Sequence, residues 1–224
     1  MSRLFYRTAQ AVIGLGLLLS SSLAVLATPT GLNNIPTAEV VPQRVLVLQG
    51  FSQFGTDLSP GWFIGAKYGP ARNLEVGVDD TAAGTGSSAG PVLQGKLRLP
   101  LGSKRALALG AANLSGDIGR NGEIFPYLVV SAGFKAFNAH LGHSWQKDNR
   151  AWFVGIDHAV NRKLTLRADW IEANDGEDSL ASLGFIQQID SRWLVEAWSS
   201  LPSESGRHTS HIVKLDYVIP LGLP

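Results

Sequence analysis

The 224-residue chain contains no cysteine, and only 17% of its residues are charged. Without cysteine it can form no disulfide, offers no thiolate to a metal or substrate, and lacks the acylated cysteine of a bacterial lipoprotein. Its formal net charge of +1 gives no clustered basic excess of the kind that binds nucleic acid. Packing and hydrogen bonding must therefore stabilise the protein, and nucleic acid is excluded as a partner.

The first 27 residues have the pattern of a secretory signal peptide. Arg3 and Arg7 precede a largely apolar stretch, and a run of small and apolar residues ends at Ala27. An uncleaved membrane anchor is the alternative, but serines interrupt a stretch that is already short for a spanning helix. We therefore predict export, with residues 1–27 removed; the loss of two arginines leaves 17 basic against 18 acidic residues.

After residue 27 no apolar run is long enough for a spanning helix, and apolar residues instead alternate with polar ones. Leu164, Leu166, Ala168 and Trp170, for example, alternate with Thr165, Arg167 and Asp169. A period of two predicts strands with one apolar and one polar face. About twelve strands are expected, near residues 43–53, 61–69, 73–80, 90–101, 105–113, 124–136, 138–145, 150–160, 163–172, 178–189, 192–201 and 208–219.

The connections between these strands alternate between short and long. Tight turns are expected at 70–72, 102–104, 137–138, 161–162 and 190–191, and mostly longer connections at 54–60, 81–89, 114–123, 146–149, 173–177 and 202–207. An up-and-down transmembrane β-barrel has short periplasmic turns and longer outer loops. The predicted fold class is all-β: an antiparallel transmembrane barrel over residues 43–224, preceded by a periplasmic or lumenal leader at 28–42.

The tryptophans favour a membrane barrel over a soluble exported barrel or sandwich, in which large aromatics would lie mid-strand. They fall at strand ends, where they form the girdles that anchor a barrel at the lipid interface. The predicted girdle consists of Trp62, Trp145, Trp152, Trp170, Trp193 and Trp198. Phe51, Phe54 and Phe125 are assigned to the outer belt, and Phe134, Phe137 and Tyr217 to the inner one.

If the apolar faces meet lipid, the opposite faces line the lumen. A charge facing lipid at mid-membrane would cost about 2 to 4 kcal/mol. The charges lie at alternate positions along the strands, which indicates that this face points away from lipid. The predicted lumen-lining residues are Lys67, Glu75, Lys96, Arg98, Lys135, Asp157, Arg167, Asp169, Glu196, Lys214 and Asp216. This pattern fits a narrow pore for small polar solutes, and equally an ion-paired interior that conducts little.

Signals for catalysis or metal binding are weak. His140 and His143 are three residues apart on a strand, so they face opposite ways and cannot share a metal. His140 and Ser144 share a face, but it is the interior one, unlike the lipid-facing site of outer-membrane phospholipases. We predict no enzyme, no catalytic residues, no metal and no cofactor, with an outer-membrane hydrolase as the third hypothesis after a channel and a structural barrel.

The leader Thr30–Pro42, TGLNNIPTAEVVP, resembles the Gly-Leu, Pro-Thr-Ala start of YjbH-like outer-membrane proteins, which are barrels linked to exopolysaccharide production in bacteria. The resemblance implies a periplasmic or lumenal N-terminal segment leading into a barrel. It also makes an envelope or exopolysaccharide-associated role the alternative to a passive channel. The expected partners are outer-membrane lipid, the barrel-assembly machinery during biogenesis, and small polar solutes or polysaccharide.

Overall fold

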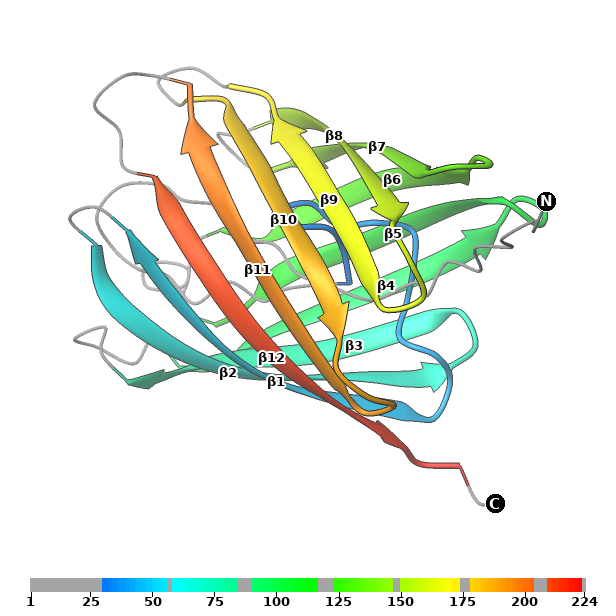
Figure 1. Ribbon diagram of the computed structural model, residues 1–224, viewed down its shortest axis with the longest axis horizontal. Coiled ribbons are helices and arrows are strands. Elements are labelled where there is room, and N and C mark those ends of the chain that lie inside the picture. The colour runs from blue at the N-terminus through cyan, green and yellow to red at the C-terminus, as the bar shows by residue number, and fades with distance from the viewer. Residues whose placement is uncertain are drawn as a thin grey trace.

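The computed structural model describes residues 30–55, 58–83, 90–116, 123–146, 150–173, 178–203 and 209–222. Twelve antiparallel strands close into one barrel, in which β1 pairs with β12 (Figure 1). This confirms the predicted fold; the signal peptide lies outside the described residues. The strands are β1 (Val45–Gly55), β2 (Leu58–Ala71), β3 (Leu74–Ala83), β4 (Val92–Pro100), β5 (Arg105–Leu114), β6 (Phe125–Gly133), β7 (Asn138–Trp145), β8 (Arg150–Ala159), β9 (Leu164–Ile171), β10 (Leu180–Gln188), β11 (Trp193–Pro202) and β12 (Ser210–Pro220).

Two predicted connections are wrong. The expected long connection at 54–60 is reduced to residues 56–57, because β1 and β2 continue pairing as far as Gly55 and Leu58. The expected turn at 137–138 is a longer one that follows the end of β6 at Gly133. There the Phe134 amide donates to the Phe137 carbonyl at 2.8 Å, and the two rings stack with centroids 4.9 Å apart.

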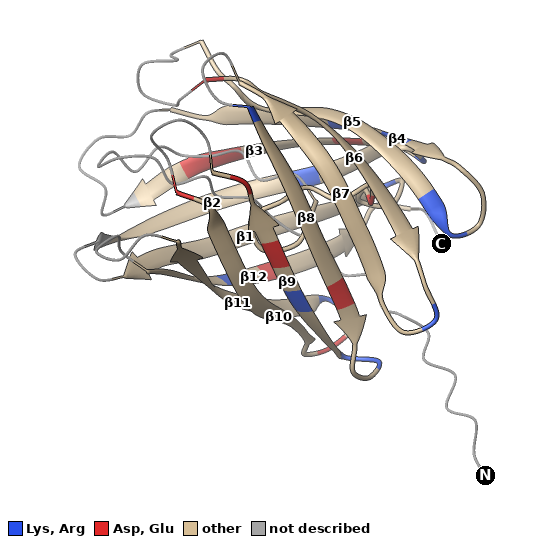
Figure 2. Cartoon of the chain, turned by 90° about the horizontal axis from the view of Figure 1, so that it is seen from above, with Lys and Arg blue, Asp and Glu red and all other residues tan. Residues whose placement is uncertain are grey.

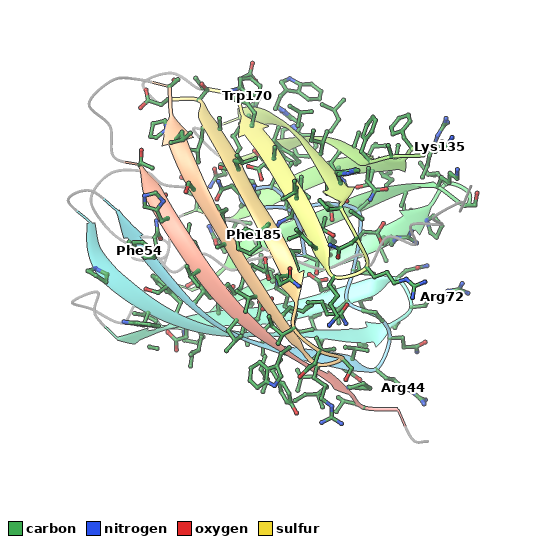
Figure 3. All side chains as sticks on the ribbon, viewed as in Figure 1. Arg44, Phe54, Arg72, Lys135, Trp170 and Phe185 are labelled. Atoms are coloured by element: carbon green, nitrogen blue, oxygen red, sulfur yellow. The ribbon has the colours of Figure 1, made fainter. Side chains whose placement is uncertain are left out.

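The outer surface of the barrel is apolar. On β9 and β12 the side chains predicted to face outward do so: Leu166 is 45% exposed, Val213 45% and Leu215 44%. Figure 3 shows such side chains projecting from the outside of the strands, with Phe185 among them. Closure pairs each described strand with a neighbour on both sides. Backbone pairing together with an apolar exterior is what a strand needs to cross hydrocarbon.

A charge on this surface should destabilise the barrel according to its depth. Ile156 lies in the outward row of β8 and is 49% exposed. We expect Ile156→Lys to lower the free energy of unfolding in lipid vesicles by about 2 to 4 kcal/mol, because it places an ammonium group in the hydrocarbon layer. Val160→Lys, in the same row but beyond the end of the strand, should cost less than about 1 kcal/mol. Equal effects would contradict a lipid-facing exterior.

Both ends of the barrel chain lie at the end that carries the tight turns. The Leu221 amide donates to the Arg44 carbonyl at 2.6 Å, and the Arg44 amide donates to Gly69 at 2.7 Å. Arg44 has a positive φ of 62°, which redirects the chain where it enters β1. The residues before it, 30–42, turn back into the lumen and are visible inside the barrel in Figure 1. Residues 30–42 are the described part of the predicted leader, and from here on the name leader is used for these residues.

Basic residues gather at the tight turns, as Figure 2 shows. Arg72, Lys104, Arg105, Arg162, Lys163 and Arg192 are all exposed there. Asp190, the acid among them, accepts hydrogen bonds from the backbone amides of Arg192 at 2.7 Å and Trp193 at 2.9 Å. These bonds stabilise the carboxylate and lower the pKa of Asp190 below its ordinary value. The acid thus shapes its turn and leaves the surface predominantly basic.

Candidate functional site: an occupied lumen

The leader forms a small hairpin inside the barrel. Gly31 and Pro36 form an antiparallel bridge, the Thr37 amide donates to the Thr30 carbonyl at 3.1 Å, and the Leu32 amide donates to Ile35 at 2.9 Å. All residues from 30 to 38 are buried. Some backbone amides and carbonyls of the hairpin therefore bond within it, and others are left to bond to the barrel wall.

The hairpin tip sits on a carboxylate from β9. One oxygen of Asp169, Oδ2, accepts the backbone amides of Asn33 at 2.8 Å and Asn34 at 3.2 Å. Two adjacent amides aimed at one anion form a compact anion-binding arrangement. Asp169 was predicted to line the lumen, and its role there is to hold the leader.

The Asn34 side chain binds three polar groups on two further strands, β10 and β11. Its Nδ2 donates to the hydroxyls of Ser182 and Ser200, the latter at 2.7 Å, and its Oδ1 accepts from Trp198 Nε1 at 3.1 Å. Trp198 is only 5% exposed and points inward. Its assignment to the lipid girdle is therefore wrong. Trp198 does lie near the end of its strand, but it alternates in step with Glu196 and Ser200 and so faces the lumen.

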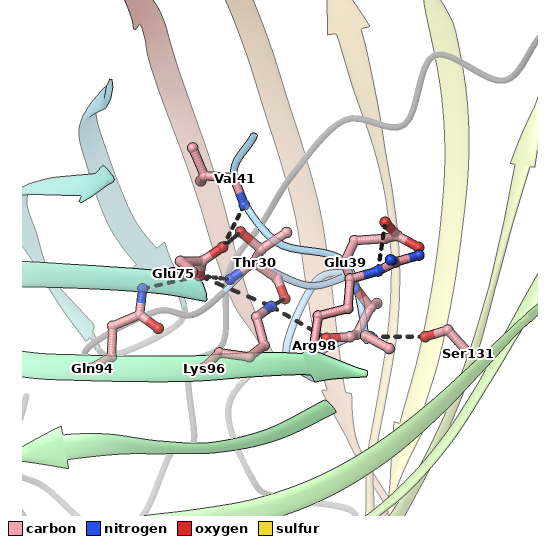
Figure 4. A network of polar contacts seen from close by, with 10 residues as sticks. Thr30, Glu39, Val41, Glu75, Gln94, Lys96, Arg98 and Ser131 are labelled. Carbon is pink, nitrogen blue, oxygen red and sulfur yellow. Dashed lines mark hydrogen bonds and ion pairs between the residues drawn. The ribbon is translucent and has the colours of Figure 1, made fainter. Parts of the chain in front are cut away.

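The base of the hairpin is held by an ion pair between β3 and β4 (Figure 4). Glu75 accepts the amides of Thr30 at 2.8 Å and Val41 at 2.9 Å, as well as the Thr30 hydroxyl. Lys96 Nζ donates to the carbonyls of Thr30 at 2.6 Å and Thr37 at 3.2 Å. Glu75 and Lys96 lie 3.9 Å apart with fully buried side chains. Each charge thus binds the leader as well as its partner.

A third anchor is a hydrogen-bonded chain across β6, β7 and β8. The Ala38 amide donates to Ser131 Oγ at 2.8 Å, Ser131 contacts His140 Nδ1 at 2.7 Å, and His140 Nε2 contacts Asp157 at 2.9 Å. These are the residue types of a hydrolytic triad. Because the serine oxygen already accepts the leader amide, this chain serves to bind the leader. Ser144, the serine considered from sequence, instead donates to the Ala151 carbonyl at 3.4 Å.

The structure places ten of the eleven predicted lumen residues on the inner face. Arg167 pairs with Glu196 at 3.0 Å and donates to the Leu32 carbonyl at 3.3 Å. Arg98 pairs with Glu39 of the leader at 3.8 Å, with both side chains about a quarter exposed. The ten are Lys67, Glu75, Lys96, Arg98, Asp157, Arg167, Asp169, Glu196, Lys214 and Asp216.

Lys135 is the exception, and its assignment to the lumen is wrong. It is exposed in the connection between β6 and β7, as Figure 3 shows. The strand was expected to run to residue 136, which gave Lys135 an inward parity that the turn removes.

The aromatic side chains divide between the two faces. Trp62, Trp145, Trp152, Trp170 and Trp193 are between 38% and 57% exposed on the outside, and His143 packs on the rings of Trp145 and Trp152. Phe51 and Phe125 face inward, so their assignment to the outer belt is wrong. Phe51 stacks on Phe63 with centroids 5.0 Å apart, and Phe125 is 3% exposed. Phe125 belongs to the buried apolar cluster that includes Leu32 and Ile35 of the leader, and Phe51 packs against that cluster.

A cavity of about 270 Å³ lies between the leader and the tight-turn end. Its lining includes Thr37 and Glu39 from the leader, and Arg98, Lys104, His140 and Asp157 from the barrel. A polar space therefore lies on this side of the lumen, and the hairpin of the leader lies further in.

Two glycines of the wall lie close to the leader, and Gly184 lies equally close to Ala197 and Trp198 of β11. A Cβ at Gly155 would lie 2.4 Å from Leu32 Cδ1 and 2.7 Å from Ile35 Cδ1, and one at Gly184 would lie 2.6 Å from Asn33 Oδ1. The absence of a side chain at these wall positions thus leaves space for the side chains of the leader.

We expect Gly155→Leu to unseat the leader, because its side chain needs the space of Leu32 and Ile35. Limited proteolysis of the folded barrel should then cut within residues 30–42, where the wild type is protected. Gly95→Ala is the control, since a Cβ there meets nothing closer than 4.0 Å. Unchanged protection in Gly155→Leu would contradict the fit.

Several residues that hold the leader were not predicted to do so: Asn33, Asn34, Ser131, Ser182 and Ser200. His140 was assigned to the interior face without this role, and Trp198 was assigned to the girdle. Strand parity was a signal for the serines, since Ser182 and Ser200 alternate with outward residues on β10 and β11. The predicted lumen-lining set contained only charged residues, so the neutral serines on the same face were left out. No local pattern indicated that Asn33 and Asn34 would meet them.

Comparison with known proteins defines the class of fold. No family model matches the chain, and no curated protein is similar to it. Among solved structures, the KdgM porin in complex with disordered oligogalacturonate has a TM-score of 0.64 at 13% identity, covering 76% of this chain and 98% of that one. The NanC porin has a TM-score of 0.57 at 9% identity, covering 77% and 98%. Omp33 of Acinetobacter baumannii has a TM-score of 0.54 at 12% identity, covering 79% and 99%. The fold is that of a twelve-stranded porin-type barrel.

Proposed function

We propose that the chain is an outer-membrane channel for small polar solutes. The observation that carries the proposal is the sorting of side chains by the closed wall, with apolar groups outside and charges of both signs inside. The apolar exterior makes the wall stable in lipid, and a charged interior can hold the water through which polar solutes move. The similar fold of KdgM, described with oligogalacturonate, supports a hydrophilic solute.

Two charged groups of the lumen lack a hydrogen-bond acceptor among the described residues. They are the buried ammonium groups of Lys67 and Lys214. Lys214 instead lies over the rings of Phe51 at 5.6 Å and Trp198 at 5.9 Å. A buried ammonium group without an acceptor is costly in a dry interior, so this part of the lumen is suited to water and polar solutes.

The test is the conductance of the refolded full chain in a planar lipid bilayer. We expect ohmic or stepwise current carried by small ions, and passage of small neutral sugars in a vesicle-swelling assay. Heat-modifiable gel mobility should first show that the barrel has formed. Recovery of the native protein from the soluble periplasm would contradict the membrane location.

One observation favours a second candidate, a non-conducting structural or envelope-associated barrel. The leader occupies the lumen and is anchored on the wall at Glu75, Asp169 and Ser131. A barrel filled in this way holds its shape without passing solutes. The resemblance of the leader to YjbH-like proteins supports an exopolysaccharide-associated role for this candidate. Absence of current at every voltage, with or without the leader, would favour it over the channel.

A further inference from the structure

The leader is bound to the wall by polar contacts that water can replace. The wall supplies Glu75, Lys96, Ser131 and Asp169, and the leader supplies mainly backbone amides and carbonyls. When the leader leaves, the groups exposed on the wall are charged or hydroxylic and become solvated. A polar receptacle of this kind favours reversible occupation over permanent packing.

The apolar part of the contact comes from a few leader side chains, all of them buried. Leu32, Ile35 and Ala38 are the leader side chains that join the buried apolar cluster formed with Phe63, Phe125, Tyr127 and Phe153. The strands themselves close through their own ladder, with β1 paired to β12 over eleven positions from Val45 to Gly55. The wall therefore does not depend on the leader for its closure.

The attachment of the leader sets the direction in which it can move. It joins the barrel at Pro42–Arg44, next to the tight turns, and predicted cleavage after Ala27 leaves its other end free. The cavity of about 270 Å³ lies on the same side. The ion pair between Glu39 and Arg98 borders this cavity and is partly exposed, so it is the contact that water reaches first.

We propose that residues 30–42 are a displaceable gate, which closes the lumen when seated on Glu75, Asp169 and Ser131 and opens it by swinging toward the tight-turn end about Pro42–Arg44. This rests on the proposed channel function and assigns its regulation to the leader. Solutes pass only in the unseated state. The fraction of time that the leader spends unseated sets the time-averaged conductance of the barrel.

The absence of native cysteine allows a clean test with one engineered pair, Asn34→Cys with Ser200→Cys. These side chains contact each other across the tip of the hairpin, with Nδ2 and Oγ 2.7 Å apart. Oxidation should lock the leader in its seat and lower the conductance at least about tenfold relative to the reduced protein. Each single variant, given the same oxidant and reductant, is the control for loss of the Asn34 contacts.

A second readout follows the movement itself. In the single variant Asn34→Cys the thiol is buried in the seated state, since Asn34 is 1% exposed. A water-soluble maleimide should label it in the folded barrel, because unseating of the leader exposes the thiol. Protection of the single variant for as long as the barrel remains folded would overturn the gate.

The outcomes separate the gate from the channel. Current that falls on oxidation and returns on reduction supports both. Current that is the same in the oxidised and reduced pair overturns the gate and leaves the channel, because solutes then pass a fixed leader. If neither the folded wild type nor a folded variant lacking residues 30–41 carries current, both the channel and the gate are overturned. A silent wild type beside a conducting deletion variant overturns the gate, because the leader is then a permanent closure.

Discussion

Deletion of residues 30–41 should raise the time-averaged current per inserted barrel at least about tenfold above that of the full chain, because a twelve-stranded wall without internal filling encloses a water-filled lumen. The residues removed include the buried hairpin 30–38. The groups left behind include Glu75, Lys96, Arg167 and Asp169, whose charges hold water in the widened path. The measurement is conductance in a planar bilayer, after gel mobility has shown that the variant is folded.

A synthetic peptide with the sequence of residues 28–42 provides the matched control for this deletion. Added to the side of the bilayer that faces the tight turns, it should reduce the current of the deletion variant, because the receptacle on Glu75 and Asp169 remains intact. A scrambled peptide of the same composition should not. An unchanged conductance in the folded deletion variant would show that the leader does not obstruct the path.

The second large effect is expected at Glu75. We expect Glu75→Ala to lower the free energy of unfolding by about 3 to 5 kcal/mol, because it leaves the buried ammonium group of Lys96 without its charged partner. It also removes the acceptor of the Thr30 and Val41 amides. Denaturant unfolding in vesicles, followed by tryptophan fluorescence, measures the change.

Two further variants test whether this loss of stability comes from the unpaired buried charge. Lys96→Ala together with Glu75→Ala should be less destabilising than the sum of the single changes, since neither charge is then left buried alone. Glu39→Ala removes the partly exposed partner of Arg98 and should cost no more than about 1 kcal/mol. A Glu75→Ala effect as small as that of Glu39→Ala would mean that the carboxylate is solvated and does not hold the leader.

The outer surface was predictable because it depends on the period of the strands and on no distant contact. Alternation on β9 placed Leu166 outside and Arg167 inside, and the structure agrees. Errors arose where a strand ended differently from expectation. Lys135 lies in a turn that the pattern assigned to a strand, and Trp198 has the position of a girdle residue but the parity of a lumen residue.

The candidate site was only half predictable. Charges on the lumen face were found by parity, since a lone charge facing lipid is costly. Their partners were not, because the contacts join positions far apart in the chain: Asn34 meets Ser200 across 166 positions, and Thr30 meets Glu75 across 45. The resemblance of the leader allowed a periplasmic or a lumenal position and did not decide between them.

By itself, the sequence determined a twelve-stranded wall with an apolar outside and a charged inside, because a period of two sorts side chains locally along every strand. Tertiary structure alone decided what the charged inside is for. Closing the sheet brings Glu75, Asp169 and Ser131 around one segment of the chain, and their hydrogen-bonding capacity is met by the amides of the leader. The lumen is thereby occupied, a property that no stretch of sequence carries because it depends on three strands and the leader at once.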